Sequence, residues 1–522
     1  MTETAYYGDI LTLARGAGLY AEALLVRNGR IICVGSRRHV QAFASPGAKC
    51  VELDGRTLMP GFIDSHSHIL RYSQSLGSAD LTLARSFADI GRALTAFKRE
   101  SGIPDGQFVT GFGYEHNLLA ERRHPTRADL DALGISSPLL ITHRSGHAGA
   151  LSSSALDALD AHGSAHDENG AERDASGELT GYMEESAFIR FASMLPRPGL
   201  HSQLDMMRRA QRVYASHGIT TAQEGFLDAD TLTLFDALRE NGELSIDVIG
   251  YIDCAIAGRL TPASMRYLNH MRLGGLKLFL DGSPQAKTAW LSQPYIGGDS
   301  LGYRAHSDSE AAGAVSAALA RGVQLAAHCN GDAACEQLIR AYEAVMAGGR
   351  YSRAHRPVMV HAQLVRSDQL LRMRKIGIIP SFFISHIRYW AQAHLDNLGM
   401  RRAERISPAK SALALGLPFT LHQDTPVLPP NQLELVELAV TRQAAFGSLG
   451  LFERISPLDA LRAVTGNAAF QCFEEHSKGA LRPSMRADMV ILDRNPLRAH
   501  PTDIGAITVL ETIKDGVTVF RR

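Results

Sequence analysis

Eight short apolar segments, most of them ending in a polar or ionisable residue, constrain the fold of this 522-residue chain more than any other feature. Stretches with a helical pattern separate them. Continuous apolar strands that alternate with helices are typical of a parallel sheet that is buried on both faces. Eight such strands with polar groups at their carboxyl ends predict an α/β protein with a closed (β/α)8 TIM barrel and an active site on that rim. The segments are 58–66, 218–224, 245–253, 275–281, 324–328, 357–361, 376–385 and 418–424.

Short β-like runs also occur at both ends of the chain. Residues 20–53 hold two of them around the turn Arg27-Asn28-Gly29, and residues 489–520 hold three more with the turn Lys514-Asp515-Gly516. Such strands cannot bury a face on their own. They therefore predict one small β-sandwich built from both termini, residues 1–57 and 476–522, around a barrel domain of residues 58–475.

The first two barrel segments are separated by about 150 residues, far more than a βα unit needs. The intervening sequence has strand-like runs of its own, Phe108-Val109-Thr110 and Leu139-Leu140-Ile141-Thr142. We therefore expect an α/β subdomain, roughly residues 75–200, inserted after the first barrel strand.

The composition argues against several classes of partner. Lys plus Arg and Asp plus Glu number 54 each, so no basic excess attracts nucleic acid or an anionic membrane. No window approaches the roughly 18 uninterrupted apolar residues of a membrane span, and the first ten residues lack the pattern of a signal peptide. The six cysteines are scattered without a CxxC pair, which is typical of reduced thiols and predicts a cytoplasmic protein.

The strongest local signal is MPGFIDSHSH at residues 59–68. Positions i and i+2 of a strand face the same side, so His66 and His68 can direct two imidazoles at one metal ion. A histidine pair of this kind can arise by chance, but its position directly after PGFID favours a metal site.

Lys277 lies within the apolar sequence GGLKLFLDGS at residues 274–283. A buried ammonium group is costly to desolvate, and it has no lone pair for a metal. Addition of CO2 would convert the amine into a carbamate, an anion that can bridge two cations. The alternative is a lysine at the strand end that pairs with a carboxylate such as Asp281.

Three further ionisable residues, His328, His361 and Asp424, each end an apolar segment. A single histidine at such a place is more often a packed, hydrogen-bonded core residue than a ligand. Together with the residues above, however, the candidates end strands one, four, five, six and eight of one barrel. This combination predicts a centre with one or two divalent cations, for which Zn²⁺ suits the ligands best and Mn²⁺, Fe²⁺ or Co²⁺ also fit.

The set of motifs resembles the amidohydrolase superfamily, and its detail is similar to amidohydrolase family 3, the branch that includes N-substituted formamide deformylases. The similarity covers nearly the whole chain, in family order. The matching phrases are PGFIDSHSH (60–68), SGHAGALSSSAL (145–156), RDASGELTGYMEE (173–185), KLFLDGSPQAKTAWLSQPY (277–295), AHCNGDAA (327–334), PSFFISHIRYW (380–390), LHQDTPVLPP (421–430), ALRAVTGNAAF (460–470) and KGALRPSMRADMVILDRNPL (478–497).

The resemblance implies the barrel, the terminal sandwich, a homodimer and a metal centre with a carbamate on Lys277. The implied ligands are His66, His68, Lys277, His328, His361 and Asp424. Asp424 would also carry protons. Many relatives have Gly-Ser-Asp where this chain has His422-Gln423-Asp424, which places an extra imidazole near the site. The number of metal ions varies within the family, so one and two ions both stay open.

Further polar residues are candidates for the substrate pocket. His386 follows the seventh strand segment and, with the aromatic residues after it, offers a proton donor and an apolar wall. Arg144 and His147 form an Arg-x-x-His phrase in the insertion, for which surface structure is an equal alternative. His422 is a further candidate, and Gln285 and Tyr114 are weaker ones.

The chemistry expected of this ligand set is hydrolysis. Divalent cations lower the pKa of bound water from about 15.7 toward 7, and Asp424 can take its proton and pass it to a departing nitrogen. We therefore expect cleavage of a small-molecule, non-peptide amide, such as an N-substituted formamide, a carbamate or a cyclic amide. Two alternatives stay open: ester or phosphoester hydrolysis or isomerisation at the same centre, and a non-catalytic regulator that binds a ligand.

Overall fold

The computed structural model describes residues 3–16, 18–160, 170–195, 199–241, 244–349 and 352–522. The chain forms two compact units. One consists of Met1–Ile69 with Gln211–Arg522, and the other of Leu70–Ala210. The first contains the barrel strands and a sheet from both termini, and the second is an α/β insertion.

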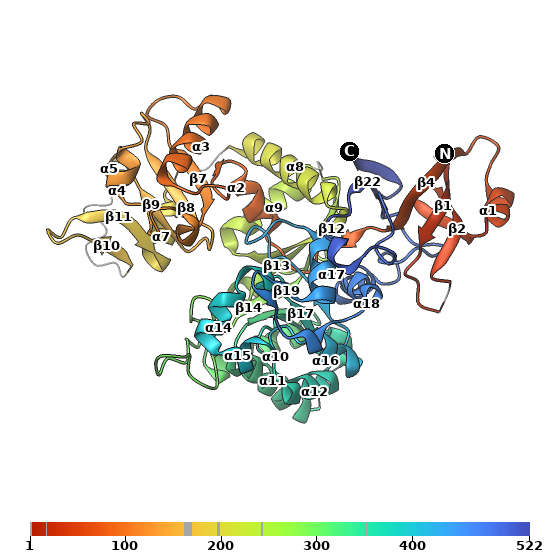
Figure 1. Ribbon diagram of the computed structural model, residues 1–522. Coiled ribbons are helices and arrows are strands. Elements are labelled where there is room, and N and C mark those ends of the chain that lie inside the picture. Colours follow the sequence, from red (N-terminus) through yellow and green to blue (C-terminus); the bar gives the residue numbers. More distant parts are fainter. Residues whose placement is uncertain (1–2, 17, 161–169, 196–198, 242–243, 350–351) are drawn as a thin grey trace. The chain divides into compact units, whose positions relative to one another are not determined.

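Eight parallel strands form the central sheet of the first unit (Figure 1), and they confirm the eight segments and the barrel fold class predicted from the sequence. Nearly every strand residue is buried, as expected for parallel strands covered on both faces. In sheet order the strands are β18 (Thr420–Leu421), β17 (Ile379–Phe382), β16 (Val358–His361), β15 (Gln324–Cys329), β14 (Met271–Phe279), β13 (Asp247–Asp253), β12 (Ile219–Leu227) and β5 (Phe62–Ile63).

The two outermost strands of this order, β5 and β18, are joined at their carboxyl ends. The Ser65 hydroxyl donates to the carbonyl of Leu421 (3.0 Å), and the amide of His68 donates to the carbonyl of Thr425 (2.7 Å). The sheet therefore curls until the segment after β5 lies beside the segment after β18.

The first apolar segment is divided between two sheets. Its beginning belongs to β4 (Lys49–Pro60), which pairs with the terminal sheet, and only Phe62–Ile63 forms a barrel strand. Gly61 separates them where the backbone approaches Thr220 closely, because a Cβ at Gly61 would lie 2.5 Å from the Thr220 Cγ2 atom. The apolar pattern alone does not show which sheet each half joins.

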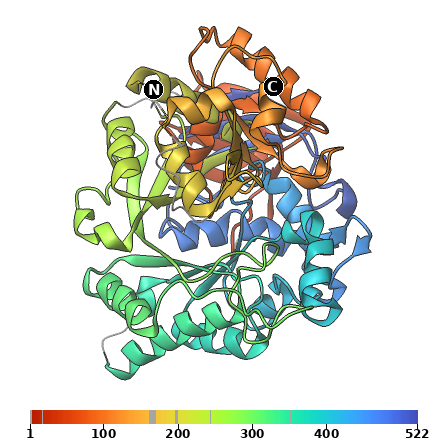
Figure 2. The same cartoon turned by 90° about the vertical axis from the view of Figure 1, so that its left-hand side faces the viewer.

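Helices follow most of the strands and cover the outside of the sheet, as Figure 2 shows for the green and teal helices. The helix that follows β14 begins with a capping box, in which Ser307 accepts from the Glu310 amide and the Glu310 carboxylate accepts from the Ser307 amide. The covering helices include α9 (Ala229–Asn241), α10 (Asp308–Ala320), α11 (Asp332–Ala347), α12 (Ser367–Ile376) and α17 (Gln432–Thr441).

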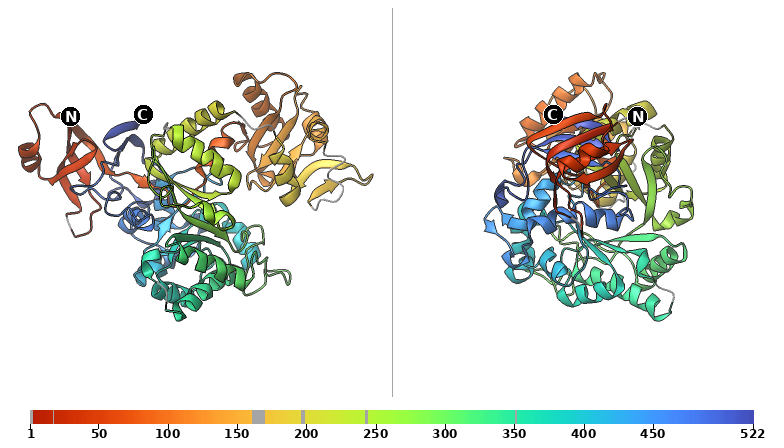
Figure 3. Two further views of the ribbon diagram at one scale, coloured as in Figure 1. Left: turned by 180° about the vertical axis from the view of Figure 1, so that it is seen from behind. Right: turned by 90° about the vertical axis from the view of Figure 1, so that its right-hand side faces the viewer.

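Strands from both termini build one seven-stranded mixed sheet, in agreement with the prediction that the chain ends join. Figure 3 shows the red N-terminal strands beside the blue C-terminal ones. The junction is the antiparallel pair β4 and β21, in which Leu58 lies opposite Ile491. The sheet order is β23 (Val517–Arg521), β22 (Val509–Lys514), β21 (Met489–Leu492), β4, β1 (Glu3–Leu11), β2 (Tyr20–Arg27) and β3 (Arg30–Gly35).

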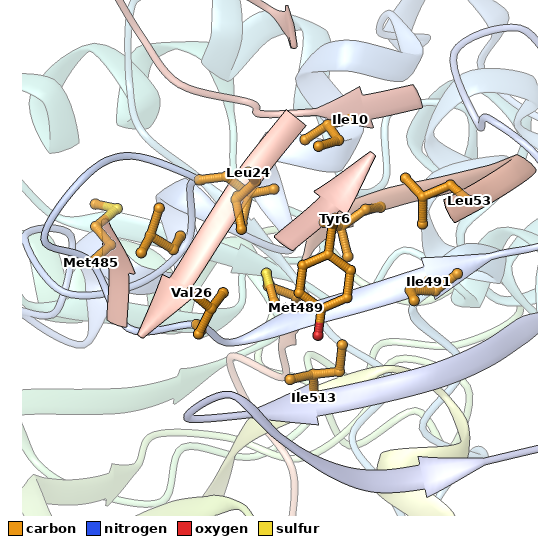
Figure 4. Close-up of a cluster of buried hydrophobic side chains, with 13 residues drawn as sticks. Tyr6, Ile10, Leu24, Val26, Leu53, Met485, Met489, Ile491 and Ile513 are labelled. Carbon is orange, nitrogen blue, oxygen red and sulfur yellow. The ribbon is translucent and has the colours of Figure 1, made fainter. Parts of the chain in front are cut away.

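Alternate residues of this sheet pack on opposite faces. Tyr6 and Leu24 pack against Met489 and Ile491 from the C-terminal strands on one face (Figure 4). Their neighbours in sequence pack on the other face around Val40 of α1 (Arg37–Phe43). Each fully buried aliphatic side chain contributes about 1.5–3 kcal/mol to the free energy of unfolding. Because the first of these faces is packed from both ends of the chain, this contribution requires both ends.

A buried carboxylate ties the barrel to the C-terminal segment. Asp247, at the start of β13, accepts from Arg486 (2.9 Å) and contacts Lys478 and Lys514. Burial alone would raise the pKa of Asp247, but the Lys478 charge, a hydrogen bond with His270 and the charges of Lys514 and Arg486 hold it well below its usual range. This network lies at the amino ends of the strands, where a barrel places residues for stability rather than catalysis.

The insertion is built on a six-stranded sheet with two parallel and three antiparallel pairings. The two strand-like runs predicted within it form β7 and β8. The sheet order is β10 (Ala171–Arg173), β11 (Leu179–Glu184), β9 (Ala148–Leu151), β8 (Leu139–His143), β7 (Val109–Tyr114) and β6 (Ala79–Asp80). The helices beside it include α3 (Phe87–Glu100), α4 (Arg127–Asp131), α5 (Ser153–Ala158) and α7 (Glu185–Ser193).

All six cysteines are free thiols, as the sequence predicted. Within the described residues, the helices are too short or too polar to cross a membrane.

Candidate metal centre

The predicted ligands come from five barrel strands and meet at their carboxyl ends. His66 and His68 follow β5, and Asp424 follows β18, which the curled sheet brings next to β5. Lys277 lies in β14, His328 lies in β15, and His361 ends β16. The strand register places Phe279 opposite His328 and Cys329 opposite His361.

His66, His68 and Asp424 present three ligand atoms within 4.8 Å of one another. Oδ1 of Asp424 lies 3.5 Å from Nε2 of His66 and 3.5 Å from Nε2 of His68. Ligands about 2.05 Å from a tetrahedral Zn²⁺ lie about 3.3 Å from one another. These spacings fit a shared cation. The buried Oδ1 atom of Asp424 also has no hydrogen-bond partner among the described residues, which agrees with this.

Lys277 extends into the same cluster. Its Nζ atom lies 3.3 Å from Nε2 of His66, and burial lowers its pKa to about 8. The carboxylate of Asp281 accepts instead from the amides of Trp290, Asn330 and Gly331. The alternative that Lys277 pairs with Asp281 therefore has no support in the described contacts.

The rings of His328 and His361 lie next to each other, with centroids 4.5 Å apart, and the His361 ring lies 5.6 Å from that of His66. Nδ1 of His328 donates to Oδ1 of Asp281 (3.1 Å), and its Nε2 lone pair accepts from the side-chain amide of Asn330 (3.3 Å). Nε2 of His361 lies 3.9 Å from Oδ2 of Asp424. The binding of a second cation by His328 and His361 stays a prediction.

The extra imidazole of His422 lies directly behind this group. Its Nε2 atom lies 3.1 Å from Nδ1 of His361, and its Nδ1 atom lies 2.9 Å from the Ser381 hydroxyl. Burial lowers the pKa of His422 to about 3, so its ring is neutral at physiological pH. We interpret His422 as a neutral support for His361.

Two acidic residues of this site were missed in the sequence. Glu224 ends the second barrel segment and accepts from Nδ1 of His68 (3.2 Å), which directs the His68 Nε2 lone pair toward Asp424. Asp64 is fully buried within PGFIDSHSH, and burial raises its pKa to about 7. The available signal was an acidic residue at a strand end and another next to the histidine pair.

The backbone is strained at two of the candidate ligands. His361 has φ 70° and Asp424 has φ 56°, a left-handed conformation that residues other than glycine rarely adopt. Each costs about 1–3 kcal/mol, and such strain is concentrated at functional sites.

His386, predicted to touch substrate, is buried at the start of α13 (His386–Tyr389), with its ring 4.7 Å from those of Phe383 and Trp390. Its Nδ1 atom lies 2.9 Å from Nε2 of the fully buried His394. Nδ1 of His394 has no partner among the described residues, which favours a lone pair there rather than an orphaned N–H. His394 then donates to His386, whose own proton is on Nε2.

The remaining substrate candidates are distributed over both units. Gln285, in the first unit, has a buried Oε1 without a partner among the described residues. Tyr114, Arg144 and His147 belong to the insertion. Tyr114 is buried and bonded to His124 (3.1 Å), and His147 is more than half exposed, 3.3 Å from Glu185. Their contact with substrate stays a prediction.

Comparisons with known proteins agree with this architecture. The sequence profile of the amidohydrolase family matches residues 49–520. N-substituted formamide deformylase from Arthrobacter pascens is 27% identical, over 96% of this chain and 95% of the relative. Putative amidohydrolase YtcJ from Bacillus subtilis (strain 168) is 24% identical, over 99% of each chain.

An uncharacterized metal-dependent hydrolase from Pyrococcus horikoshii OT3 superposes with a TM-score of 0.80 at 25% identity, over 96% of this chain and 99% of that one. Another from Pyrococcus furiosus has a TM-score of 0.78 at 24% identity, over 95% and 100%. Because the profile match spans far more than half of the sequence, the chain belongs to the amidohydrolase family.

Proposed function

We propose that the protein is a metal-dependent hydrolase that cleaves a carbon–nitrogen bond in a small, non-peptide amide, such as an N-substituted formamide, a carbamate or a cyclic amide. The observation that carries the proposal is the convergence of His66, His68 and Asp424 at the carboxyl ends of the barrel strands. The family match and the formamide deformylase relative support the amide class.

The cation would be held by Nε2 of His66, Nε2 of His68 and a carboxylate oxygen of Asp424. His328 and His361 provide ligands for a second ion, and Zn²⁺ suits this donor set best. In its neutral form the Lys277 amine could add to CO2 and lose one proton, and the resulting carbamate would be an anionic ligand. Burial favours this reaction because it disfavours the ammonium form.

When bound, a divalent cation supplies a Lewis acid that makes water a nucleophile near neutral pH. Burial would raise the pKa of Asp424, but His68, His361 and His66 hold it well below its usual range. Asp424 is therefore ionised at neutral pH and accepts the proton of the attacking water. It then returns that proton to the leaving nitrogen.

His386 serves the substrate rather than the cation. With its proton on Nε2, it can donate a hydrogen bond to the carbonyl oxygen of an amide. Phe383 and Trp390 border its ring and provide apolar surface that keeps water from this donor. The substrate, in this proposal, is an uncharged amide with an apolar substituent. A homodimer and a cytoplasmic location remain further predictions.

The test is Asp424→Asn in protein whose metal content has been measured. We expect kcat to fall by about 10²–10⁴, as for loss of a general base, while His66 and His68 retain metal. Asp396→Asn on the exposed side of α14 (Ala391–Leu398) is the matched control and should keep full turnover.

The substrate panel for this test contains formamides, carbamates, cyclic amides, carboxylic esters and phosphoesters. Full turnover by metal-loaded Asp424→Asn contradicts the role of Asp424. Turnover of esters with none of amides contradicts the amide class and favours the alternative reaction at the same centre.

A further inference from the structure

The insertion contains a second group of ligand-type side chains. Strands β7 and β8 are parallel neighbours, with Tyr114 opposite His143. Glu115 and His116 directly follow β7, and His143 ends β8. Because parallel strands end at the same edge of a sheet, three residues separated by up to 28 positions in sequence meet there.

The three ligand atoms form a nearly equilateral triangle. Oε1 of Glu115 lies 3.3 Å from Nδ1 of His116 and 3.5 Å from Nε2 of His143, and the two histidine nitrogens are 3.3 Å apart. Hydrogen bonds between an ionised group and a nitrogen are about 2.7–2.9 Å long. The edge of a ligand tetrahedron around Zn²⁺ is about 3.3 Å, so the spacing fits a shared ion better than direct hydrogen bonds.

Neighbouring groups orient two of these ligands. The backbone and side-chain amides of Asn117 both donate to Oε1 of Glu115 (3.2 and 3.0 Å). The His116 ring stacks on His124 at 4.0 Å, and His124 stacks on Tyr182 at 4.3 Å. Support of this kind is what holds metal ligands in place before the ion binds.

Ser145 orients the third ligand, His143. Nδ1 of His143 lies 2.9 Å from the hydroxyl and 3.1 Å from the amide of Ser145. The Ser145 amide donates to this nitrogen, and together with the hydroxyl it fixes the orientation of the His143 ring.

We propose that Glu115, His116 and His143 form a binding site for a divalent transition-metal ion, with ligands separate from those of the barrel centre. Two imidazoles and one carboxylate are typical Zn²⁺ ligands, and a water can complete the coordination. The bound ion links the chain segments that follow β7 and β8. It would therefore stabilise this edge of the insertion.

The test uses full-length protein that has been freed of metal with a chelator and then titrated with Zn²⁺ alone. Calorimetry gives the affinities, and elemental analysis gives the zinc bound per chain. We expect the double variant His116→Gln with His143→Gln to bind one equivalent fewer than the wild type. His201→Gln, at an exposed histidine of the same unit, is the matched control and should bind as the wild type does.

Glu115→Gln preserves the shape of the site but removes its charge, and should weaken the same equivalent at least about tenfold. Circular dichroism and thermal unfolding show whether each variant is folded. Wild-type stoichiometry in the folded double variant overturns the proposal. If the double variant does not fold, an unchanged zinc affinity of Glu115→Gln overturns it instead.

Discussion

Gly225 in β12 lies directly behind the histidine pair of the barrel centre. A Cβ added there would lie 2.4 Å from Cε1 of His66, 2.9 Å from its Nδ1 and 3.1 Å from Cε1 of His68. The Gly225 backbone is not in the left-handed region, so alanine is compatible with the strand itself. Gly225→Ala therefore tests whether the positions of these two imidazoles matter.

The size of the effect follows from these distances. To restore an ordinary contact, the His66 ring has to move by about 1 Å, and a displacement of that size at a catalytic centre can cost about 10²-fold in rate. Overpacking costs about 1–3 kcal/mol, whereas replacing glycine by alanine in a strand returns about 0.5–1 kcal/mol. We expect the fold to persist with a modestly lower Tm, while metal affinity and kcat/KM fall about 100-fold.

The assay compares metal content, kcat/KM and Tm of Gly225→Ala with those of the wild type. Gly313→Ala in α10 is the matched control, because a Cβ there meets no atom within 4 Å, and it should leave all three quantities unchanged or raise Tm. Full metal occupancy and full activity in Gly225→Ala would refute the reasoning that places the cation at His66 and His68.

Two further predictions concern carboxylates that hold other groups in place. The folded pKa of Asp247 is depressed, so its contribution to stability is present above the unfolded value of about 3.9 and is lost as pH falls through the folded value. Asp247→Asn leaves Lys478 buried without its main partner. It should lower the free energy of unfolding by about 3–5 kcal/mol near pH 7, and urea unfolding should show that this free energy depends less steeply on acid pH. Equal losses at pH 7 and pH 2 would contradict this. Asp281→Asn replaces the charged acceptor of His328 Nδ1 by a neutral amide and should weaken metal binding about 10–100-fold in competition with a chelator. An unchanged affinity would show that His328 does not bind the ion.

The barrel could be predicted from the sequence because parallel strands that are buried on both faces are continuous apolar runs. The limits of individual strands could not. The segment predicted at 58–66 is shared between β4 and β5, and the partner of Leu58 is Ile491, more than 400 residues later. Such long-range pairing leaves no periodic signal in either segment.

The ligand candidates were named from strand ends, and the structure brings them together, although their role as ligands stays a prediction. The residues that hold them were harder to find, because Glu224 and Asp281 act through contacts with His68 and His328 rather than through a motif. The sequence did not predict the group formed by Glu115, His116 and His143, because it depends on which strands of the insertion are neighbours.

Anomalous diffraction from a crystal of the purified protein, recorded at the zinc absorption edge, tests the central claim most directly. The account predicts a peak bounded by Nε2 of His66, Nε2 of His68 and the carboxylate of Asp424. Zinc-saturated crystals with no peak between these three side chains would contradict it.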